Sequence, residues 1–541
     1  MNLDGYLQER QRFQWHVPSH FNMGTAIFEQ NRPQATALMD VQEDLSVRPY
    51  TFGELHTLAN RLGNLLRHLG IGAADRVGIF LSQSVELAVA HLAVYQIGAV
   101  AVPLFTLFGD DALSYRLNDA GVRVLIADGD EWPRLKAMRA RWTGVERVIA
   151  TRVTHADGPD LVPWQQIAEA SPELVPQASA ADDAAVIIYT SGTTGAPKGA
   201  LHAHRLLLGH LPGVVMPHQH FPQAADMMWT PADWAWIGGL FDVLLPSLYL
   251  GVPVVAFRGG KFDPATAMDL LRRLPIRNVF FPPTALRILR NYIDCALPGI
   301  ALRTLASGGE PLGEDLWDWI GRVFRVVPAE FYGQTEANLL IGNAPDLFAP
   351  QRASMGLPMH GHELVLLNEA GVAVGDGETG EICVQLPDPV AFLGYWNQTA
   401  ATQAKTRGGV IHTGDLARRD AAGFFYFVGR TDDVINSSGY RIGPTEIEQV
   451  LLTHPAVSMV AVIGKPDAVR GEIVKAFIVP RDSDLPGREQ LSRDLQDLVR
   501  NRLGRYEYPR EIEYVAALPT TATGKIQRSV LRQAERAKET S

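Results

Sequence analysis

The 541-residue sequence predicts an α/β protein with two parts of different size. Up to Glu363, short apolar runs alternate with helical patterns, which is typical of parallel sheets covered by helices. Short strands with glycine-rich turns come next, and a compact α+β segment of roughly 110 residues follows Asp432, a normal domain size. We therefore expect a large N-terminal domain at 1–429, a hinge at 430–432 and a small C-terminal domain at 433–541.

The first predicted elements alternate between helix and strand. A helix begins at Thr51, because Thr51 and Glu54 fit a capping box and leucines recur at helical spacing up to Leu69, before Gly70. Later runs predict strands at 77–81, 99–102, 122–127, 185–189, 252–257 and 279–281, and helices over 85–95 and 264–274. The stretch 151–179 is rich in Pro, Asp and Ala, which indicates an irregular connection.

The pattern changes after Glu363. Glycine-rich turns separate short strands at 364–367, 381–384 and 424–428, which favours a small antiparallel or barrel-like portion. The C-terminal segment predicts, in order, a helix over 445–452, strands at 457–464 and 473–480, a helix over 488–502 and a strand at 511–515.

Charge and composition narrow the class of protein. A formal net charge of −10 and an isoelectric point near 5.9 argue against a nucleic-acid scaffold, whose surface would be basic. The two cysteines, Cys295 and Cys383, are too few for a disulfide framework or a thiolate zinc site, and they suit a reducing compartment. Neither a long uncharged apolar run nor a signal-like N-terminus occurs. We expect a cytoplasmic protein with no membrane span and no nucleic-acid partner.

The stretch 190–199, TSGTTGAPKG, follows the buried-strand run at 185–189. Glycine lets backbone N–H groups approach an anion, hydroxyls add donors, and Lys198 supplies a mobile cation, which together suit a polyphosphate. The alternative is a flexible Ser/Gly surface turn, although linkers rarely end in Pro-Lys-Gly after a buried strand. The ordinary P-loop pattern does not apply, because Pro197 and Gly199 flank Lys198.

Further polar clusters follow this loop in a fixed order. They are SGGEP at 307–311, FYGQTE at 331–336, HTGD at 412–415, GRTDD at 429–433 with NSSGYR at 436–441, and TATGKI at 521–526. Each cluster alone is a weak signal, whereas the ordered set is specific.

The ordered set resembles the superfamily of adenylate-forming enzymes, which includes acyl-CoA synthetases, amino-acid adenylation domains and luciferases. The resemblance covers nearly the whole chain, and YGQTE at 332–336 and YEYPR at 506–510 look most like the medium-chain and acetyl-type acyl-CoA synthetases. It implies a large N-terminal domain of two α/β sheets plus a distorted β-barrel, and a small mobile α+β C-terminal domain.

The resemblance implies an ATP site, whose residues would be Thr190, Ser191, Gly192, Thr193, Thr194, Gly195, Lys198, Gly308, Gly309, Glu310, Pro311, Tyr332, Gly333, Gln334, Asp415, Arg430 and Arg441. The loop would hold the phosphates, 308–311 would line the adenine, and Asp415 with Arg430 would lie at the ribose. Thr335, Glu336 and Lys525 would be catalytic.

The three catalytic residues make chemical sense together. A carboxylate that attacks an α-phosphate brings two anions together, so a mobile cation and Mg²⁺ must offset their charge. The resemblance implies that Lys525 donates to both anions, Thr335 contacts phosphate and Glu336 holds Mg²⁺, which a hard carboxylate oxygen suits. Asp432 would be the hinge for a second state that binds CoA, with Ser438 and Gly439 at the pantetheine tunnel and Arg500 near the 3′-phosphate.

The acid would lie against Trp234, Gly238 and Gly333. Acetyl-specific relatives carry tryptophan at the place of Gly333, so we expect an acid larger than acetate. Gly238 falls where amino-acid adenylation domains carry an aspartate, which argues for an uncharged tail. Trp234 is as well explained by core packing. Ala337-Asn338 replaces the common Thr-Gly beside this site, a departure that bears on substrate class.

The sequence therefore predicts a ligase that uses ATP, Mg²⁺ and coenzyme A to activate a short- or medium-chain or branched fatty acid through acyl-AMP, as a monomer or homodimer. Two alternatives stay open: an aryl-CoA ligase for benzoate-like acids, and a stand-alone adenylation protein that loads a carrier protein. The histidines at 202, 204, 210, 218 and 220 are too irregularly spaced to favour a metal site.

Overall fold

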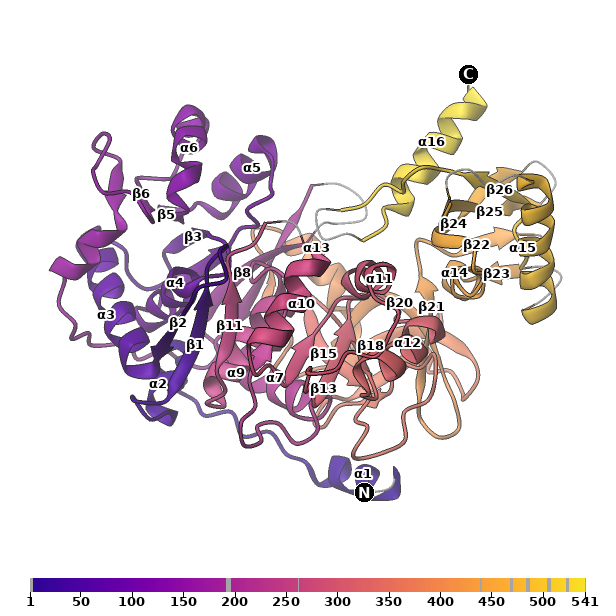
Figure 1. The fold of residues 1–541 in the computed structure, drawn as a ribbon, viewed down its shortest axis with the longest axis horizontal. Coiled ribbons are helices and arrows are strands. Elements are labelled where there is room, and N and C mark those ends of the chain that lie inside the picture. The colour runs from indigo at the N-terminus through magenta and orange to yellow at the C-terminus, as the bar shows by residue number, and fades with distance from the viewer. Residues whose placement is uncertain are drawn as a thin grey trace.

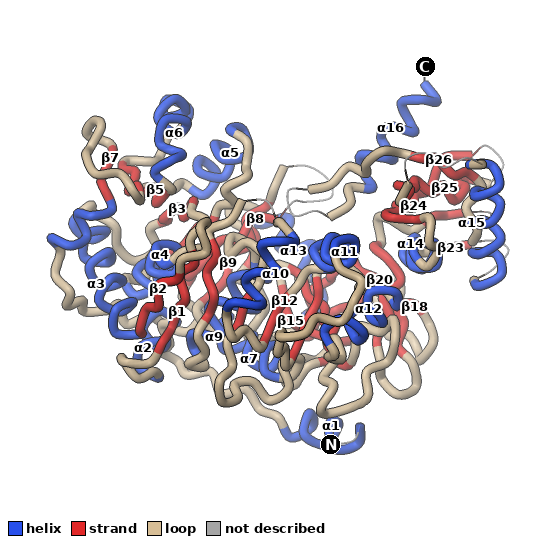
Figure 2. The backbone as a smooth tube through the Cα atoms, viewed as in Figure 1, coloured by secondary structure: helices blue, strands red, loops and turns tan. Residues whose placement is uncertain are grey.

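The computed structural model has a large N-terminal part built on two helix-covered sheets and a small C-terminal part at its edge (Figure 1). It describes residues 3–190, 196–260, 262–437, 440–467, 470–482, 487–503, 507–521 and 525–540. Figure 2 shows the strands of the large part with helices packed around them, which confirms the predicted α/β class.

The first large sheet bears the predicted phosphate loop near one edge. Within the described residues its order is β19-β9-β8-β4-β3-β5-β6-β7. The bounds are β3 Arg76–Phe80, β4 Val100–Pro103, β5 Val124–Ala127, β6 Arg147–Ala150, β7 Leu161–Pro163, β8 Ala184–Thr190, β9 Lys198–Ala203 and β19 Gly394–Tyr395. Neighbours from β8 to β7 are parallel, whereas β9 returns antiparallel to β8 with Thr190 opposite Lys198.

The second large sheet has the order β16-β15-β14-β13-β12-β10-β11-β1-β2. The bounds are β1 Thr36–Val41, β2 Val47–Thr51, β10 Met228–Trp229, β11 Val254–Phe257, β12 Asn278–Phe280, β13 Thr304–Gly308, β14 Ala329–Gln334, β15 Ala337–Gly342 and β16 Leu357–Pro358. The central strands, from β1 to β14, run parallel. Two predicted motifs follow the carboxyl ends of β13 and β14, the edge at which α/β sheets bind ligands.

Helices pack on both sheets. Their bounds are α1 Leu3–Arg12, α2 Met23–Gln30, α3 Phe52–His68, α4 Val85–Gln96, α5 Asp110–Ala120, α6 Trp132–Met138, α7 Leu206–Val215, α8 Ile237–Gly239, α9 Leu245–Tyr249, α10 Pro264–Arg273, α11 Pro283–Tyr292, α12 Glu314–Phe324 and α13 Thr399–Lys405. The capping box predicted at Thr51 and Glu54 is present at the start of α3. A π-helical turn, η4 (Leu240–Leu244), lies between α8 and α9.

A small antiparallel sheet follows the second large sheet. Its order is β17-β18-β20-β21, with bounds β17 Leu364–Leu367, β18 Thr379–Gln385, β20 Val410–Arg419 and β21 Phe425–Arg430. Strands were expected here, but the expected barrel is not closed by the described strands, because β17 and β21 form the two edges of the sheet.

The C-terminal part has a sheet of its own, in the order β23-β22-β25-β24 with β26 beside β25. The bounds are β22 Ile435–Ser437, β23 Tyr440–Ile442, α14 Pro444–Leu452, β24 Val457–Asp467, β25 Gly471–Pro480, α15 Arg488–Arg502, β26 Glu511–Tyr514 and α16 Arg528–Thr540. Its core contains Ile435, Val462 and Leu495 and no residue of the large part among those described.

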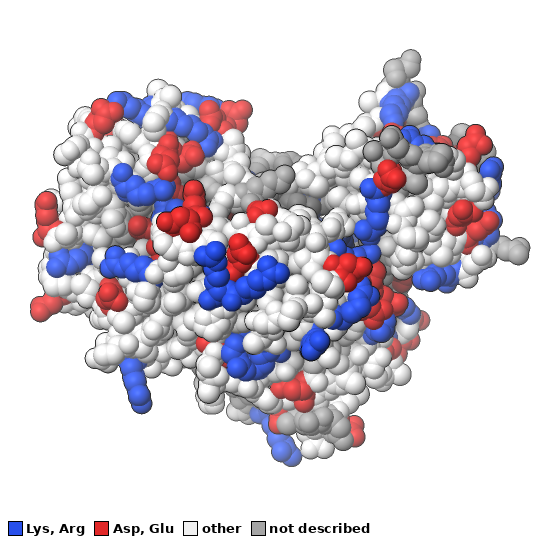
Figure 3. Space-filling model, viewed as in Figure 1, with Lys and Arg blue, Asp and Glu red and all other residues white. Residues whose placement is uncertain are grey.

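Charged side chains of both signs are interspersed over the face shown in Figure 3. None of the described helices is long and apolar enough to cross a membrane.

Candidate active site

The phosphate loop leaves β8 at Thr190 and returns in β9 at Lys198. The hydroxyl of Thr190 donates to the carbonyl oxygen of Lys198 at 3.4 Å. Ser191, Gly192, Thr193, Thr194 and Gly195 lie outside the described residues. The ammonium of Lys198 lies 5.1 Å from the ring centroid of Tyr395, on strand β19, which pairs with β9. Strand pairing thus brings the end of the loop to Tyr395.

Glu336 lies in the turn between β14 and β15 and is buried. The hydroxyl of Tyr395 donates to its Oε1, and Lys405 Nζ lies 4.0 Å from the same oxygen. Burial and the neighbouring Glu336 raise the pKa of Tyr395 above its usual range, so its hydroxyl stays a donor. Tyr395 and Lys405 were not predicted from the sequence, because both follow Glu336 by about sixty residues or more and belong to no motif.

Asp415, on β20, has a protein partner on each of its oxygens. Tyr332 donates to Oδ2 at 2.7 Å, Gln334 donates to the same oxygen, and Arg430 Nη1 lies 3.3 Å from Oδ1. The β20–β21 register places Arg430 directly opposite Asp415. Burial raises the pKa of Asp415, and the Arg430 cation opposes that rise.

Lys405, at the end of α13, connects the two carboxylates. Its ammonium donates to Gln334 Oε1 and to the carbonyl oxygen of Thr413, each at 3.1 Å, and it lies near Glu336. Thr335 lies between Gln334 and Glu336 in the same turn. The residues of YGQTE and HTGD therefore form one hydrogen-bonded network, which we call the carboxylate network: Tyr332, Gln334, Glu336, Tyr395, Lys405, Thr413, Asp415 and Arg430.

The turn Gly308–Pro311 follows β13 and is fixed from behind by helix α11. Glu310 accepts hydrogen bonds from Thr284 Oγ1 and Arg287 Nη1, each at 3.1 Å. A Cβ on Gly308 would lie 2.5 Å from the ring of Phe331, so glycine is required there. Gly309 has φ +88°, a conformation that favours glycine.

Lys525 reaches this turn from the C-terminal part. Its Nζ lies 3.9 Å from the position that a Cβ on Gly309 would take. Two hydrogen bonds between Lys525 and Thr521, of 2.8 and 3.1 Å, hold its loop. Arg481 donates to Asn291 at 3.0 Å, which joins the C-terminal part to α11. The structure thus brings together two motifs more than two hundred residues apart.

Not every predicted residue joins this group. Arg500 lies on α15, where it pairs with Asp497 and stacks on Tyr508 at 4.3 Å. Figure 1 shows α15 on the side of the C-terminal part that faces away from the large part. Asp432 accepts from Arg430 Nε at 3.1 Å. Ser438, Gly439 and the side chain of Arg441 lie outside the described part of the chain.

The predicted acyl residues differ in how far they are buried. Trp234 is fully buried, whereas Gly238 and Gly333 keep part of their surface accessible. A Cβ on Gly333 would lie 2.3 Å from Asn338 Oδ1 and 2.4 Å from the backbone nitrogen of Leu339. Leu339, with φ +56°, turns β15 into that space. Gly333 therefore accommodates the backbone of β15, and its role in opening the acyl site to a larger acid stays a prediction.

A buried polar cluster, which we call the Asp242 cluster, lies beside Gly238 and consists of Asp242, Asn338 and His210. Asn338 Nδ2 donates to Asp242 Oδ1 at 2.6 Å and lies 3.2 Å from His210 Nε2. A Cβ on Gly238 would lie 3.4 Å from Asp242 Oδ2. The inference of an uncharged tail from Gly238 overlooked Asp242, one helical turn later, although the unusual Asn338 was a signal.

The clustered histidines pack into the core of the large part. His202, His204, His210 and His218 are buried, and burial lowers the pKa of each below its usual value. Among the described residues, the group of His, Cys, Asp and Glu whose ligand atoms lie within 4.8 Å of one another is Glu381, Cys383 and His412.

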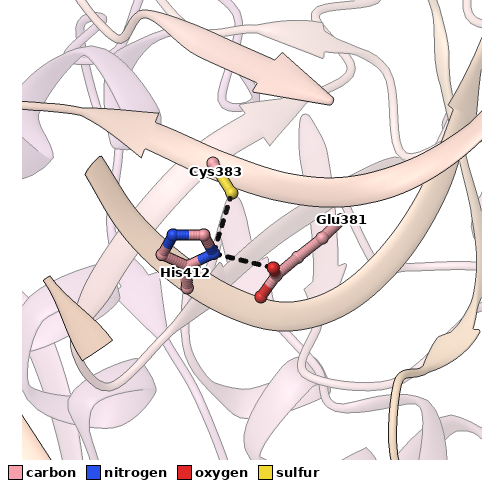
Figure 4. Close-up of side chains that lie close together, drawn as sticks. All are labelled: Glu381, Cys383 and His412. Carbon is pink, nitrogen blue, oxygen red and sulfur yellow. Dashed lines mark hydrogen bonds and ion pairs between the residues drawn. The ribbon is translucent and has the colours of Figure 1, made fainter. Parts of the chain in front are cut away.

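Figure 4 shows this group, which holds the turn before Asp415 in place. His412 Nδ1 lies 2.7 Å from Glu381 Oε2, and Arg407 Nη2 lies 3.3 Å from the same nitrogen. Burial raises the pKa of the Cys383 thiol to about 12, so a neutral thiol and a guanidinium face the imidazole, which does not suit a cation. Glu381 also accepts from the N–H of Gly414 at 2.8 Å and so fixes the turn.

Comparison with known proteins agrees with this geometry. The family model described as AMP-binding enzyme matches residues 27–396, and the one described as AMP-binding enzyme C-terminal domain matches 446–525. An uncharacterized acyl-CoA ligase, YtcI, of Bacillus subtilis (strain 168) is 32% identical over 509 residues, which cover 93% of each chain. The mitochondrial acyl-coenzyme A synthetase ACSM4 of Mus musculus is 32% identical over 536 residues, 96% of this chain and 91% of that protein.

A solved structure is similar over the whole fold. The crystal structure of the anthranilate CoA ligase AuaEII in complex with anthranoyl-AMP has a TM-score of 0.87 and 29% identity, covering 97% of this chain and 99% of that one. The chain belongs to the AMP-binding enzyme family, as an adenylate-forming acyl-CoA synthetase, a ligase that joins a carboxylic acid to CoA with ATP.

Proposed function

We propose that this ligase activates a carboxylic acid larger than acetate on the carboxylate network, with Lys525 supplied by the C-terminal part. A carboxylate oxygen of the acid attacks the α-phosphorus of ATP, and the bond to pyrophosphate breaks. The CoA sulfur then attacks the acyl carbonyl carbon, AMP leaves, and the thiol proton goes to solvent. The observation that carries this proposal is the position of the Lys525 ammonium at Gly309, beside a network whose carboxylates are already held in place.

In this proposal each part of the network has one task. Asp415, with Arg430 opposite, accepts from the ribose hydroxyls, while the turn 308–311 lies along the adenine. Thr190, Lys198 and the loop between them hold the departing phosphates, and Thr335 contacts phosphate. Lys525 offsets the charge that builds up as two anions approach.

Glu336 suits Mg²⁺. Its oxygen Oε1 accepts from the Tyr395 hydroxyl and lies 4.0 Å from the Lys405 ammonium, and a carboxylate oxygen is the kind of hard ligand that Mg²⁺ prefers. When bound, the ion would neutralise phosphate charge. Glu336, Tyr395 and Lys405 would hold and orient the groups around it.

We further propose that the C-terminal domain, 433–541, rotates at a hinge, 430–432, between the two half-reactions. With Lys525 at Gly309 the arrangement suits adenylation. Helix α15, which carries Arg500, then lies on the side of the C-terminal part that faces away from the large part (Figure 1). A CoA role for Arg500, Ser438, Gly439 and Arg441 therefore requires the second arrangement. Two free thiols, Cys295 and Cys383, support a reducing, cytoplasmic location.

Two classes of carboxylic acid are candidates for the substrate. The resemblance of YGQTE at 332–336 and YEYPR at 506–510 to the medium-chain acyl-CoA synthetases supports a medium-chain fatty acid. A second candidate is an aryl acid: the anthranilate CoA ligase is similar over the whole fold, and Phe280 lies 3.2 Å from the position of a Cβ on Gly238, so an aromatic face borders the predicted tail position.

The test is pyrophosphate release from a panel of straight, branched and aromatic acids, with and without CoA. We expect release with at least one acid larger than acetate, and sustained turnover with CoA. Release that needs a carrier protein and ignores CoA would overturn the proposal in favour of a carrier-loading protein.

A further inference from the structure

The Asp242 cluster joins three elements next to the predicted acid tail. His210 comes from α7, Asp242 from the π-helical turn η4, and Asn338 from β15, two residues after Glu336. All three side chains are at least nine-tenths buried. A π turn is rare and often marks a functional site, and here it is the turn that carries Asp242.

The hydrogen bonds of the cluster can be assigned one by one. His210 Nδ1 lies 2.8 Å from the carbonyl oxygen of Leu206, an acceptor, so Nδ1 carries the proton and Nε2 is an acceptor. Burial lowers the pKa of His210 to about 3, which keeps the ring neutral. Asn338 Nδ2 therefore gives one hydrogen to Nε2 and the other to Asp242 Oδ1, and this fixes the amide orientation.

This assignment leaves one acceptor without a donor. Among the described residues, the hydrogen bond found to the Asp242 carboxyl is the one from Asn338 to Oδ1, and none is found to Oδ2. Asp242 is 4% exposed, so bulk water does not solvate its second oxygen freely. A buried acceptor without a partner is costly, and a carboxylate oxygen costs more than a neutral one.

The second oxygen of Asp242, Oδ2, lies toward Gly238. Asp242 Oδ2 is the oxygen that faces Gly238, which keeps part of its surface accessible and which lacks a side chain that could cover it. Phe280 borders the same position. The place beside Gly238 thus combines an aromatic face with one hydrogen-bond acceptor, a combination that selects a group by its orientation.

We propose that the acid carries an amino or hydroxyl substituent on the part that lies beside Gly238, and that Asp242 Oδ2 accepts its N–H or O–H. This inference rests on the proposed function, since it specifies the acid of the same site. It applies to an aryl acid and to a fatty acid alike. Asn338 and His210 are positioning residues, because they hold Asp242 with its second oxygen toward the acid.

Burial alone raises the pKa of Asp242 well above its usual range, and the Asn338 hydrogen bond lowers it. A donor from the acid adds a second hydrogen bond to the ionised form, so binding and ionisation support each other. An acid without a donor leaves Oδ2 unpaired inside a closed site, which is how buried polar groups reject analogues.

The test compares kcat/KM for CoA-dependent pyrophosphate release between matched acids. Benzoate is set against its amino and hydroxy derivatives, and hexanoate against its amino and hydroxy derivatives. We expect the best substituted acid to exceed its parent by about tenfold or more. In Asp242→Asn, Asn338 holds the remaining oxygen and the amide nitrogen faces the acid, so this ratio should fall to near one.

Ser247→Ala is the matched control. Its hydroxyl is buried in α9, the helix that follows η4 in the chain, and has no hydrogen-bond partner among the described residues, so the ratio should stay at the wild-type value. Asp242→Leu repeats the test without a polar group, and an ATP-induced rise in melting temperature shows that each variant is folded.

Two results would overturn the inference: a parent acid that matches all its substituted forms, or a ratio that survives in both Asp242 variants. Preference for a substituted acid in a reaction that ignores CoA would contradict the proposed function and leave the Asp242 assignment standing.

Discussion

The large and the C-terminal parts contribute to the site in opposite ways. The large part holds its carboxylates in advance: Asp415 has partners on both oxygens, and Glu336 accepts from Tyr395. The C-terminal part contributes Lys525, an exposed lysine for which no carboxylate within ion-pair distance is found among the described residues. A cation without a fixed partner is free to serve an anion that arrives, which suits a group delivered by domain movement.

The largest effect is expected from removing Lys525, the cation that the C-terminal part contributes. Lys525→Ala should lower the steady-state rate of acyl-CoA formation by about a hundred- to a thousandfold, because a donor to transition-state charge is worth about 3–4 kcal/mol. Lys538→Ala, an exposed lysine paired with Glu513 and Glu535, is the matched control and should stay near wild type. A Lys525→Ala rate within threefold of wild type would refute the assignment.

A substitution of Asp415, which the large part holds in place, should weaken nucleotide binding. In Asp415→Asn the Arg430 cation keeps Asp432 but loses Asp415 as an anionic partner, and one ribose acceptor becomes a donor. KM for ATP should therefore rise about thirtyfold, since a hydrogen bond to a charged group is worth about 2 kcal/mol. Steady-state kinetics with varied ATP check this, with Asp376→Asn, at a surface pair with Arg419, as the control. An unchanged KM for ATP would place the ribose elsewhere.

Tyr395→Phe removes the hydroxyl that holds Glu336. The Mg²⁺ concentration for half-maximal rate should rise about tenfold, the effect of losing one hydrogen bond to a carboxylate. Tyr426→Phe removes a similar tyrosine–aspartate bond, to Asp420, away from the site and should change nothing. Equal Mg²⁺ dependence in both variants would argue against a Mg²⁺ role for Glu336.

The smallest effect should come from Glu381→Gln, which loosens the bond from Glu381 to the Gly414 N–H and leaves Asp415 in place. KM for ATP should rise about threefold with kcat unchanged, because the partly buried hydrogen bond from the Gly414 N–H to Glu381 contributes about 0.5–1 kcal/mol. A matching fall in kcat would mean that the turn also affects the chemical step.

The sequence was most informative where local chemistry decides structure. Thr51 and Glu54 predicted the start of α3, and the apolar runs predicted β3, β4 and β8 to within a residue or two. Lys525 and Asp415 were found because their motifs are short and ordered.

The rest depended on long-range packing. Tyr395 reaches Glu336 only because β19 pairs with β9, and no local pattern encodes that pairing. The close packing of β15 on Gly333, where Leu339 has a positive φ, is likewise a property of the folded strand pair that the sequence pattern does not encode. Asp242 was missed because the π turn that carries it, and its contact with Asn338 of β15, belong to the folded structure and are not encoded by a local pattern.

The most direct test of the division between the two parts separates the half-reactions in Lys525→Ala. Acyl-AMP formation from acid and ATP is measured without CoA, and thioester formation is measured from supplied acyl-AMP and CoA. The account predicts that adenylation is lost and that thioester formation proceeds at close to the wild-type rate. An equal fall in both half-reactions would contradict it, because Lys525 would then act in both steps or only in maintaining the fold.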